Sequence, residues 1–511
     1  MQRSPEPRLA VGTLGVLAAL KLLLHLAAIN HYGYFRDELY YLASTEHLDW
    51  GYVDHPPLSI AVLAAVRAAF GDSLAALRIV PVLSGVATIV LVGLMARRLG
   101  GGRFAQGLAA LGALMAPVFL GQDRYYSMNA FDVLFWTLAV WTLVRALDGG
   151  GTRPWVVLGV VTGLGLLNKI SMLWFGAGLL AGLLLTPHRR ALRTIGPWLA
   201  GGIAGVIFLP YVLWEARHGW PTLEFMHNAT TQKMAEVSPL RFLLEQILQM
   251  NPGAAPVWIA GILFGLFARE GRRWRALVWI YFAVLALLVA GGRSRASYLA
   301  VAYPMLLALG GVALEGVTAT AGRRWMRPAL AVLVVGLGLV ALPMALPILP
   351  VETFVRYQSA LGLSPKTEER HRMGPLPQHY ADMFGWEQMT QLVAEAYRRL
   401  SPDERRHCRV FGQNYGEAGA IDVLGRRLGL PRALSGHNSY WLWGPGGDDW
   451  NVLIIIGGDR QDNAEFFEEI EIVGQTDSPW SMPYERGLDV SIARRPKMSI
   501  REAWPRLKMY I

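Results

Sequence analysis

Three consecutive charged residues, Arg36-Asp37-Glu38, follow the first long apolar segment of this chain, and aromatic residues lie on both sides of them. An ionisable side chain at the edge of a membrane segment is costly unless it is paired or faces water, so such a group indicates a functional site. A carboxylate in that place can take the proton from a hydroxyl nucleophile, which is general-base chemistry. The sequence therefore predicts a catalytic site at Asp37 and Glu38.

The composition is typical of a membrane protein. Of the 511 residues, 53% are hydrophobic and 17% are charged, whereas soluble domains carry about 25% charged residues. Apolar runs recur up to about residue 347, and the later residues have an ordinary globular composition. We expect a polytopic α-helical membrane domain over residues 1–349, with a first outer loop at 30–78, and a soluble α/β domain over 350–511.

Eleven apolar segments are long enough to cross a bilayer. They are predicted at 10–29, 79–96, 104–120, 131–147, 154–168, 171–186, 196–214, 253–268, 274–290, 298–316 and 328–347. Arginine clusters occupy alternate connections between them, and the positive-inside rule places these clusters in the cytoplasm. The N-terminus is then inside and residues 350–511 are outside. Segments 154–168 and 171–186 are kept separate because merging them would break this alternation.

The basic residues that give the net charge of +10 lie in these short connections and form no patch for nucleic acid. Cys408 is the only cysteine, so no disulfide framework is predicted. We interpret residues 10–29 as a retained helix and not as a signal peptide.

Polar residues are concentrated in the connections on the outer side. The first of these contains His55-Pro56-Pro57, and its segments 38–48 and 58–70 have mixed faces that predict amphipathic helices. Later outer connections contain Arg124-Tyr125, the stretch from Trp214 to about residue 250, and Arg293 to Tyr298. This concentration fits an enzyme that works at one membrane face better than a transport path at the midplane.

Several of these features resemble C-type (GT-C) integral-membrane glycosyltransferases. The resemblance lies in the acidic pair after the first helix, in the long outer loop with His55-Pro56-Pro57-Leu58, and in the alternating short loops. The runs Asn414–Ala420 and Ser435–Pro445 also look like bacterial members of this group. The most similar group is that of bacterial relatives of the protein O-mannosyltransferases, including Rgt-like enzymes and the aminoarabinose transferases that modify lipid A.

The resemblance implies the GT-C fold and an inverting sugar transfer from a polyprenyl-phosphate donor. The acceptor would be a lipid, a glycan or a protein at the outer face of the cytoplasmic (inner) membrane. In that family the acidic residue of the first loop is the catalytic base, and Asp37 is the match. Glu38 would orient the acceptor or hold an arginine. The expected partners are the donor, the acceptor and membrane lipids.

A lipid phosphate leaving group calls for cationic side chains. The predicted donor-phosphate contacts are Arg36, Arg124, Lys169, Arg293 and Arg295, and the predicted substrate contacts are His55, Tyr125, Asn129 and Tyr298. Related enzymes often have an aspartate after the Arg-Tyr pair, and here Asn129 stands near that place, with Asp132 one turn deeper.

Simpler interpretations remain for these residues. Asp37 and Glu38 can anchor a loop by pairing with arginines, and His55 before two prolines can shape a turn. Lys169 can extend to lipid headgroups, and Arg293 and Arg295 can bind anionic lipids. No Asp-x-Asp pair, histidine cluster or thiolate pattern indicates a metal site, so no cofactor is implied and a divalent metal has no support.

The segment after residue 350 is predicted to be mixed α/β. Helices are expected at 386–399, from 401 onward and at 417–428, and strands at 409–412 and 451–456, which suggests a βαβ unit. We expect no catalytic constellation there. The predicted role is to cover the active face or to help select the acceptor.

Two other functions compete with the glycosyltransferase. A transporter or flippase of a lipid-linked saccharide would need broken or polar helices at the midplane and a repeat between halves, and neither is clear. A non-enzymatic scaffold would leave the cluster Arg36-Asp37-Glu38 unexplained. The sequence therefore favours the enzyme.

Overall fold

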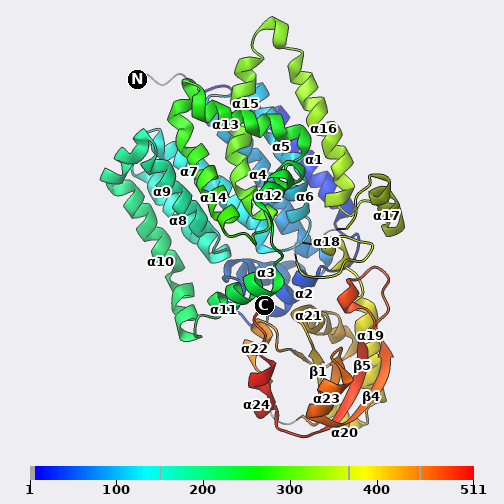
Figure 1. The fold of residues 1–511 in the computed structure, drawn as a ribbon. Coiled ribbons are helices and arrows are strands. Elements are labelled where there is room, and N and C mark those ends of the chain that lie inside the picture. The colour runs from blue at the N-terminus through cyan, green and yellow to red at the C-terminus, as the bar shows by residue number, and fades with distance from the viewer. Residues whose placement is uncertain (1–5, 150, 366, 368, 448–449) are drawn as a thin grey trace. The chain divides into compact units, whose positions relative to one another are not determined.

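The structure is a computed structural model that describes residues 6–149, 151–365, 367, 369–447 and 450–511. It divides into two compact units (Figure 1). The helical unit comprises Met1–Ile29, Ala75–Val212 and Glu236–Leu349, and the mixed unit comprises Asn30–Leu74, Leu213–Ala235 and Pro350–Ile511. The mixed unit thus contains the predicted domain 350–511 together with two segments from the first 349 residues.

The helical unit is built from long apolar helices joined by short connections. Its α-helices are α1 (Val11–Ala28), α4 (Leu74–Arg98), α5 (Arg103–Leu114), α6 (Pro117–Gln122), α7 (Met128–Leu147), α8 (Arg153–Asn168), α9 (Met172–Leu184), α10 (Ile195–Arg217), α12 (Pro239–Gln249), α13 (Ala255–Phe267), α14 (Arg275–Ala290), α15 (Tyr303–Val317) and α16 (Met326–Ala345). Short 3-10 turns connect some of them: η1 (Pro187–Arg193), η3 (Pro252–Ala254), η4 (Glu270–Trp274), η5 (Ala296–Ala302) and η6 (Ala321–Arg323).

Within the described ranges, 7 helices are long and apolar enough to cross a membrane, or up to 8 if a bent pair forms one span. The bent pair is α12 with the helix from Pro252 to Phe267, at an angle of 91°. Four of the eleven predicted segments differ from a full span. Segment 253–268 corresponds to α13, whose 13 residues lie in one arm of the bent pair. Segment 104–120 is divided into α5 and α6, and segments 154–168 and 171–186 are the separate helices α8 and α9, with 16 and 13 residues. The chain is a multi-pass membrane protein.

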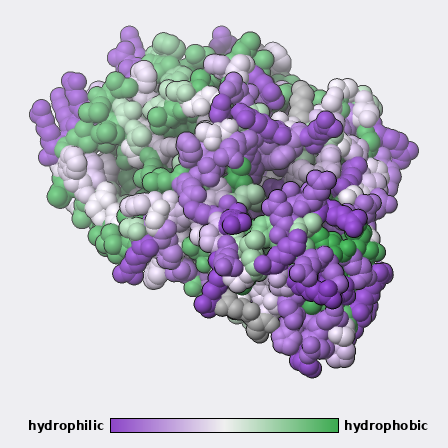
Figure 2. All heavy atoms as spheres, turned by 60° about the horizontal axis from the view of Figure 1, so that its bottom comes forward, coloured by the Kyte–Doolittle hydropathy of each residue, from purple (hydrophilic) through white to green (hydrophobic). Residues whose placement is uncertain are grey.

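The helices of this unit keep a large apolar surface. In α1 the buried positions recur every three or four residues, whereas Val16, Leu20 and Leu23 on other faces are exposed. Figure 2 shows green, apolar patches on the face that it displays, and the exposed large apolar side chains include many from α1, α10 and α16. A soluble protein rarely exposes so much contiguous apolar surface, so these faces fit contact with lipid.

The mixed unit contains a five-stranded sheet with the order β2-β1-β3-β5-β4. Its strands are β1 (Cys408–Gly412), β2 (Ala433–Leu434), β3 (Val452–Ile456), β4 (Phe467–Gln475) and β5 (Asp489–Pro496). Strands β2, β1 and β3 are parallel, with Val410 opposite Ile454, and β5 pairs antiparallel with both β3 and β4. The helix α21 (Tyr415–Val423) and the turn η7 (Gly425–Leu428) follow β1. The predicted βαβ unit is therefore confirmed, and the sequence missed β2, β4 and β5.

The other predicted helices of this unit are present as α2 (Arg36–Ser44), α3 (Leu58–Phe70), α19 (Trp386–Arg399) and α20 (Pro402–Arg406). The helix α4 begins at Leu74, within the last residues of the predicted first outer loop 30–78. The remaining helical elements are α11 (Pro221–Asn228), η2 (Ala229–Lys233), α17 (Val351–Ala360), α18 (Gln378–Ala381), α22 (Ser439–Trp443), α23 (Arg460–Phe466), η8 (Pro483–Glu485), α24 (Ile500–Ala503) and η9 (Trp504–Leu507).

Candidate active site

The two predicted acidic residues lie in the first turn of α2, in the mixed unit. The Glu38 carboxylate accepts a hydrogen bond from the Phe35 backbone N–H at 2.9 Å and is fully buried. This contact is the return half of a capping box and fixes the place where α2 begins. Asp37 faces a different environment, since its side chain is 34% exposed.

Asp37 is held by two neighbours and stays accessible. Its Oδ1 accepts a hydrogen bond from the Tyr415 hydroxyl at 2.9 Å and lies 3.8 Å from Arg36 Nε. A general base needs an ionised carboxylate that is oriented and can still reach a substrate hydroxyl. The geometry of Asp37 satisfies both conditions.

Arg36 is largely engaged inside the protein. Its Nη1 donates to the Tyr484 hydroxyl at 2.7 Å, and its Nη2 lies 4.0 Å from Asp382 Oδ2. The guanidinium carbon also lies 5.2 Å from the centre of the Tyr415 ring, which is a cation–π distance. These contacts tie α2 to three segments of the later chain. A contact of Arg36 with the donor phosphate stays a prediction.

The protein shifts the titration of groups around Asp37. Burial raises the pKa of Asp382 to about 6, and the positive charge of Arg36 opposes this rise. Burial also raises the pKa of the Tyr415 hydroxyl, so this group stays protonated and remains a donor to Asp37.

Sequence reasoning missed Asp382, Tyr415 and Tyr484 as members of the site. They come from the segment where no catalytic constellation was expected, and they contact Arg36 or Asp37 directly. A signal was present for Tyr415, which lies within the run Asn414–Ala420 that carries part of the family resemblance.

Two glycines of α21 allow it to approach α2 closely. A Cβ at Gly416 would meet the Arg36 side chain, and a Cβ at Gly419 would meet the backbone carbonyl carbon of Leu39 at 2.9 Å. At either position the Cβ would lie too close to its neighbour for ordinary packing, so only glycine fits without a shift of α2. This close packing lets the Tyr415 hydroxyl reach Asp37.

A second layer of polar residues lies next to Tyr415 and the other residues that contact Asp37 and Arg36. The Tyr40 hydroxyl is 2.8 Å from Asp54 Oδ1 and 2.7 Å from the Ser439 hydroxyl, and the Tyr40 ring stacks on Tyr415 with centroids 4.7 Å apart. Burial raises the pKa of Asp54, and the neighbouring Asp37 charge adds to this rise.

His55 belongs to this second layer. Its imidazole is buried, its Nδ1 lies 3.1 Å from the Pro56 carbonyl oxygen, and its ring stacks on Tyr41 with centroids 4.8 Å apart. These contacts fit the turn-shaping interpretation. A substrate contact for His55 stays a prediction.

The helical unit contains a second cluster of predicted residues, around Lys169. Lys169 ends α8 in an extended conformation, and its Nζ donates to Asn129 Oδ1 at 2.8 Å and lies 3.4 Å from Asp132 Oδ2. The same Nζ is 5.1 Å from the centre of the Tyr298 ring. The fold therefore brings Lys169, Asn129 and Tyr298 together from α7, η5 and the break between α8 and α9.

Asp132 completes this Lys169 cluster. The Ser171 hydroxyl donates to Asp132 Oδ2 at 2.9 Å, and the Asp132 side chain is buried. Lys169 thus faces groups of its own unit, which argues against a lysine that simply extends to lipid headgroups.

The remaining basic candidates have separate surroundings. Arg124 is buried, donates to the Ala345 carbonyl oxygen at 2.9 Å, and lies over the ring of Tyr125 at 5.4 Å. Arg293 pairs with the exposed Glu236 at 2.8 Å. Arg295 directly precedes η5, and its carbonyl oxygen accepts from the Tyr298 N–H. Their roles toward a donor stay predictions.

Side chains that bind metal ions are dispersed in the part of the chain that the structure describes. No group of three or more His, Cys, Asp or Glu residues is arranged there to hold a metal ion.

Comparisons with known proteins show that this chain is similar to membrane glycosyltransferases. Residues 54–214 match the family model described as dolichyl-phosphate-mannose-protein mannosyltransferase. The undecaprenyl phosphate-alpha-4-amino-4-deoxy-L-arabinose arabinosyl transferase 2 of Pseudomonas fluorescens is 28% identical over 219 residues, which cover 39% of this chain and 37% of that protein. The lipid A galacturonosyltransferase RgtD of Rhizobium johnstonii is 26% identical over 270 residues, which cover 50% of this chain and 54% of that protein.

The match to these curated relatives thus spans about half of their length or less. A solved structure covers far more. ArnT from Cupriavidus metallidurans, bound to undecaprenyl phosphate, superposes with a TM-score of 0.61 over 94% of this chain and 98% of that chain, at 15% identity. At that identity the likeness shows the shared fold alone.

Proposed function

We propose that this chain, a relative of the C-type glycosyltransferases with their GT-C fold, is itself an inverting glycosyltransferase. It moves a sugar from a polyprenyl-phosphate donor to a lipid, glycan or protein acceptor. One relative is named for undecaprenyl phosphate aminoarabinose, which supports the donor class, and another is named for lipid A, which supports a lipid acceptor.

The observation that carries this proposal is the environment of Asp37. Its carboxylate is part-exposed and is oriented by the Tyr415 hydroxyl at 2.9 Å. In the proposed reaction, an acceptor hydroxyl attacks the anomeric carbon opposite the phosphate. The new glycosidic C–O bond forms while the bond to the phosphate oxygen breaks, and Asp37 takes the hydroxyl proton. Polyprenyl phosphate leaves as an anion, so inversion follows from attack on the opposite face.

Glu38 has a supporting role in this mechanism. Because its carboxylate caps α2 at Phe35, Glu38 is a positioning residue that keeps Asp37 in the first turn. The polar contacts of Arg36 support the same function, since Arg36 ties that turn to Tyr484 and Asp382.

The Lys169 cluster is the best-supported contact for the donor phosphate. An ammonium group whose partners are Asn129 and Asp132 is fixed in place, and lysine supplies a compact point charge for a phosphate. A developing phosphate anion is stabilised by a cation that is already oriented. Arg36, Arg124, Arg293 and Arg295 are the further candidates, and Tyr125, Asn129 and Tyr298 are the candidate sugar contacts.

We place the reaction at the extracytoplasmic face of the cytoplasmic (inner) membrane. The support is the alternation of arginine clusters along the chain, which puts the connections that carry Asp37, Arg124 and Lys169 on the side opposite those clusters.

The test is the substitution Asp37→Asn, which keeps the size of the side chain and removes the base. Transfer is measured with radiolabelled polyprenyl-phosphate sugars in membranes that contain the full chain. We expect a loss of about 10²- to 10⁴-fold in transfer, with expression and donor binding unchanged. The matched control is Asp477→Asn, an exposed aspartate of the same unit. Normal transfer by Asp37→Asn would show that the base is wrong and would favour the transporter.

A further inference from the structure

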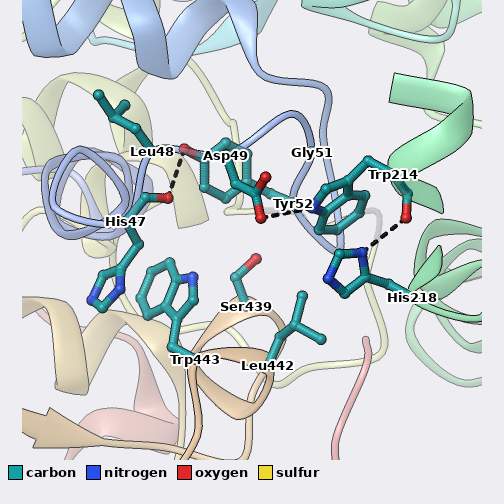
Figure 3. A pocket seen from close by; sticks show the side chains of 10 residues that line it. All are labelled: His47, Leu48, Asp49, Gly51, Tyr52, Trp214, His218, Ser439, Leu442 and Trp443. Carbon is teal, nitrogen blue, oxygen red and sulfur yellow. Dashed lines mark hydrogen bonds between the residues drawn. The ribbon is translucent and has the colours of Figure 1, made fainter. Parts of the chain in front are cut away.

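The mixed unit contains a cavity of about 270 Å³ that the reaction described above does not use (Figure 3). Its wall comes from three parts of the chain. The segment after α2 contributes His47 and Asp49, the end of α10 and the next residue contribute Trp214 and His218, and α22 contributes Ser439 and Trp443. Figure 3 shows these side chains around a common space.

Flat rings form two sides of this cavity. The imidazole of His47 stacks on the indole of Trp443 with centroids 4.1 Å apart and planes 8° apart. Trp214 lies beside His218 with centroids 4.4 Å apart, and its Nε1 donates to Asp49 Oδ2 at 2.8 Å. A histidine ring thus covers one face of each indole, and these contacts fix the orientation of both indoles before any ligand arrives.

The cavity combines those flat faces with polar groups at their edges. Asp49 offers carboxylate oxygens with further acceptor capacity, and the histidines and Ser439 add groups that donate or accept. A sugar ring has this dual character, with C–H faces that lie against an indole and hydroxyls around its rim. The volume is below the range of roughly 300–1,000 Å³ for drug-sized ligands, so it fits one small ring.

A chain of contacts links this cavity to Asp37. Ser439, which lines the cavity, lies 2.7 Å from the Tyr40 hydroxyl. The Tyr40 ring stacks on Tyr415, and the Tyr415 hydroxyl donates to Asp37. The two stacked rings of Tyr40 and Tyr415 therefore connect the cavity wall to the Asp37 carboxylate.

We propose that this cavity binds a sugar ring of the acceptor, next to the unit that carries the attacking hydroxyl. The proposal rests on the proposed function, because it names part of the acceptor for the same reaction. Asp49 determines the class of ring. Its negative charge favours a neutral sugar or an amino sugar, and it disfavours a sugar that carries a carboxylate.

The test uses saturation-transfer NMR on the full-length protein in detergent micelles, with two probes. Methyl glucosaminide carries a positive charge, and methyl glucuronide carries a negative charge. We expect saturation transfer to the glucosaminide with the wild type and its loss with Trp443→Ala. The control Trp325→Ala removes an exposed indole of the helical unit and should keep the signal.

Asp49→Asn is the second variant, because it keeps the side-chain size and an acceptor for the Trp214 N–H. We expect it to reduce the preference for glucosaminide over glucuronide roughly tenfold. Asp49 is exposed, so this variant decides the question if Trp443→Ala does not fold.

Four results separate the two proposals. If Asp37→Asn stops transfer and keeps the glucosaminide signal, both proposals stand. If Asp37→Asn transfers normally while binding still depends on Trp443, the proposed base fails and the cavity remains a sugar site. A signal that survives both Trp443→Ala and Asp49→Asn overturns the cavity proposal, and so does displacement of the glucosaminide by a polyprenyl-phosphate sugar, which would assign the cavity to the donor.

Discussion

Two neighbouring carboxylates in α2 have different environments, and helix geometry explains why. Successive residues of an α-helix point about 100° apart, so Glu38 faces inward and caps the helix at Phe35, whereas Asp37 faces outward and is 34% exposed. At the scale of single residues, this difference assigns the chemistry to Asp37 and the positioning to Glu38.

The contact between Tyr415 and Asp37 leads to a prediction. Tyr415→Phe removes only the hydroxyl that donates to Asp37 at 2.9 Å. We expect kcat to fall about tenfold, because a hydrogen bond to a charged group is lost and the base is no longer oriented. Donor KM should stay unchanged, which a general loss of structure would not produce. Steady-state kinetics of Tyr415→Phe against Tyr397→Phe, a tyrosine of α19, measure the difference, and equal kcat values for the two variants would contradict the prediction.

The Lys169 cluster leads to a second prediction at this scale. Lys169→Met keeps an unbranched side chain and removes the ammonium group that contacts Asn129 and Asp132. We expect the KM for the polyprenyl-phosphate donor to rise about tenfold, since one charge-assisted contact to a phosphate is lost. Lys169→Arg should recover most of the affinity. The control is Lys497→Met, an exposed lysine of the mixed unit, and an unchanged donor KM for Lys169→Met would assign this lysine to structure alone.

At the scale of elements, the packing of α21 on α2 positions the site. Gly416 and Gly419 lie one turn apart on α21, and each leaves room that a Cβ would fill. The parallel strand β1 is followed directly by α21, so the position of β1 in the sheet places Tyr415 next to the first turn of α2. The distance between these two helices therefore sets the distance between Tyr415 and Asp37.

Gly419→Ala tests this dependence. The added methyl group would lie 2.9 Å from the Leu39 carbonyl carbon. Either α2 must move away from α21, or the backbone of the two helices must be strained. Overpacking of this kind costs roughly 1–3 kcal/mol, and we expect a lower Tm together with a lower kcat. Gly316→Ala is the matched control, because a Cβ there meets nothing within 4 Å. An unchanged Tm and kcat for Gly419→Ala would show that the two helices are not held at contact.

At the scale of the whole molecule, the mixed unit buries several carboxyl groups near Arg36. Glu417 and Glu485 share Asn414 as a donor, at 2.8 and 3.0 Å. Burial raises the pKa of Glu485 to about 7 and the pKa of Asp382 to about 6, and it also raises the pKa of Glu417. The folded protein therefore holds these protons more tightly than the unfolded chain does.

This burial predicts how stability depends on pH. Between the ordinary pKa of 4.5 for Glu485 and its raised value of about 7, the folded state binds more protons than the unfolded state, so stability from this group falls as pH rises. We expect Glu485→Gln, which imitates the protonated form, to reduce the loss of Tm between pH 5 and pH 8 by several degrees. Thermal unfolding in detergent measures this change, with the exposed Glu468→Gln as control. An equal pH dependence in both variants would contradict the prediction.

The membrane helices and much of the sheet domain were predictable because their signals are local. Long apolar runs give the spans, and the helix at 386–399 and the strands at 409–412 and 451–456 follow from short-range periodicity. Strands β4 and β5 were missed. In β4 charged residues alternate with apolar ones and many positions are exposed, so the segment lacks the apolar run of a buried strand. The apolar pattern predicts one helix over 104–120, whereas the structure has α5, which ends at Leu114, and α6, which begins at Pro117.

The sequence by itself determined that the chain crosses a membrane and that Asp37 and Lys169 are unusual charges, because composition and neighbouring residues carry that information. The tertiary structure alone decided what surrounds each of them. Tyr415 reaches Asp37 across 378 positions of the chain, and Lys169 meets Asn129 across 40. Such contacts depend on how helices and strands pack, and no local sequence pattern encodes a contact between residues that lie far apart in the chain.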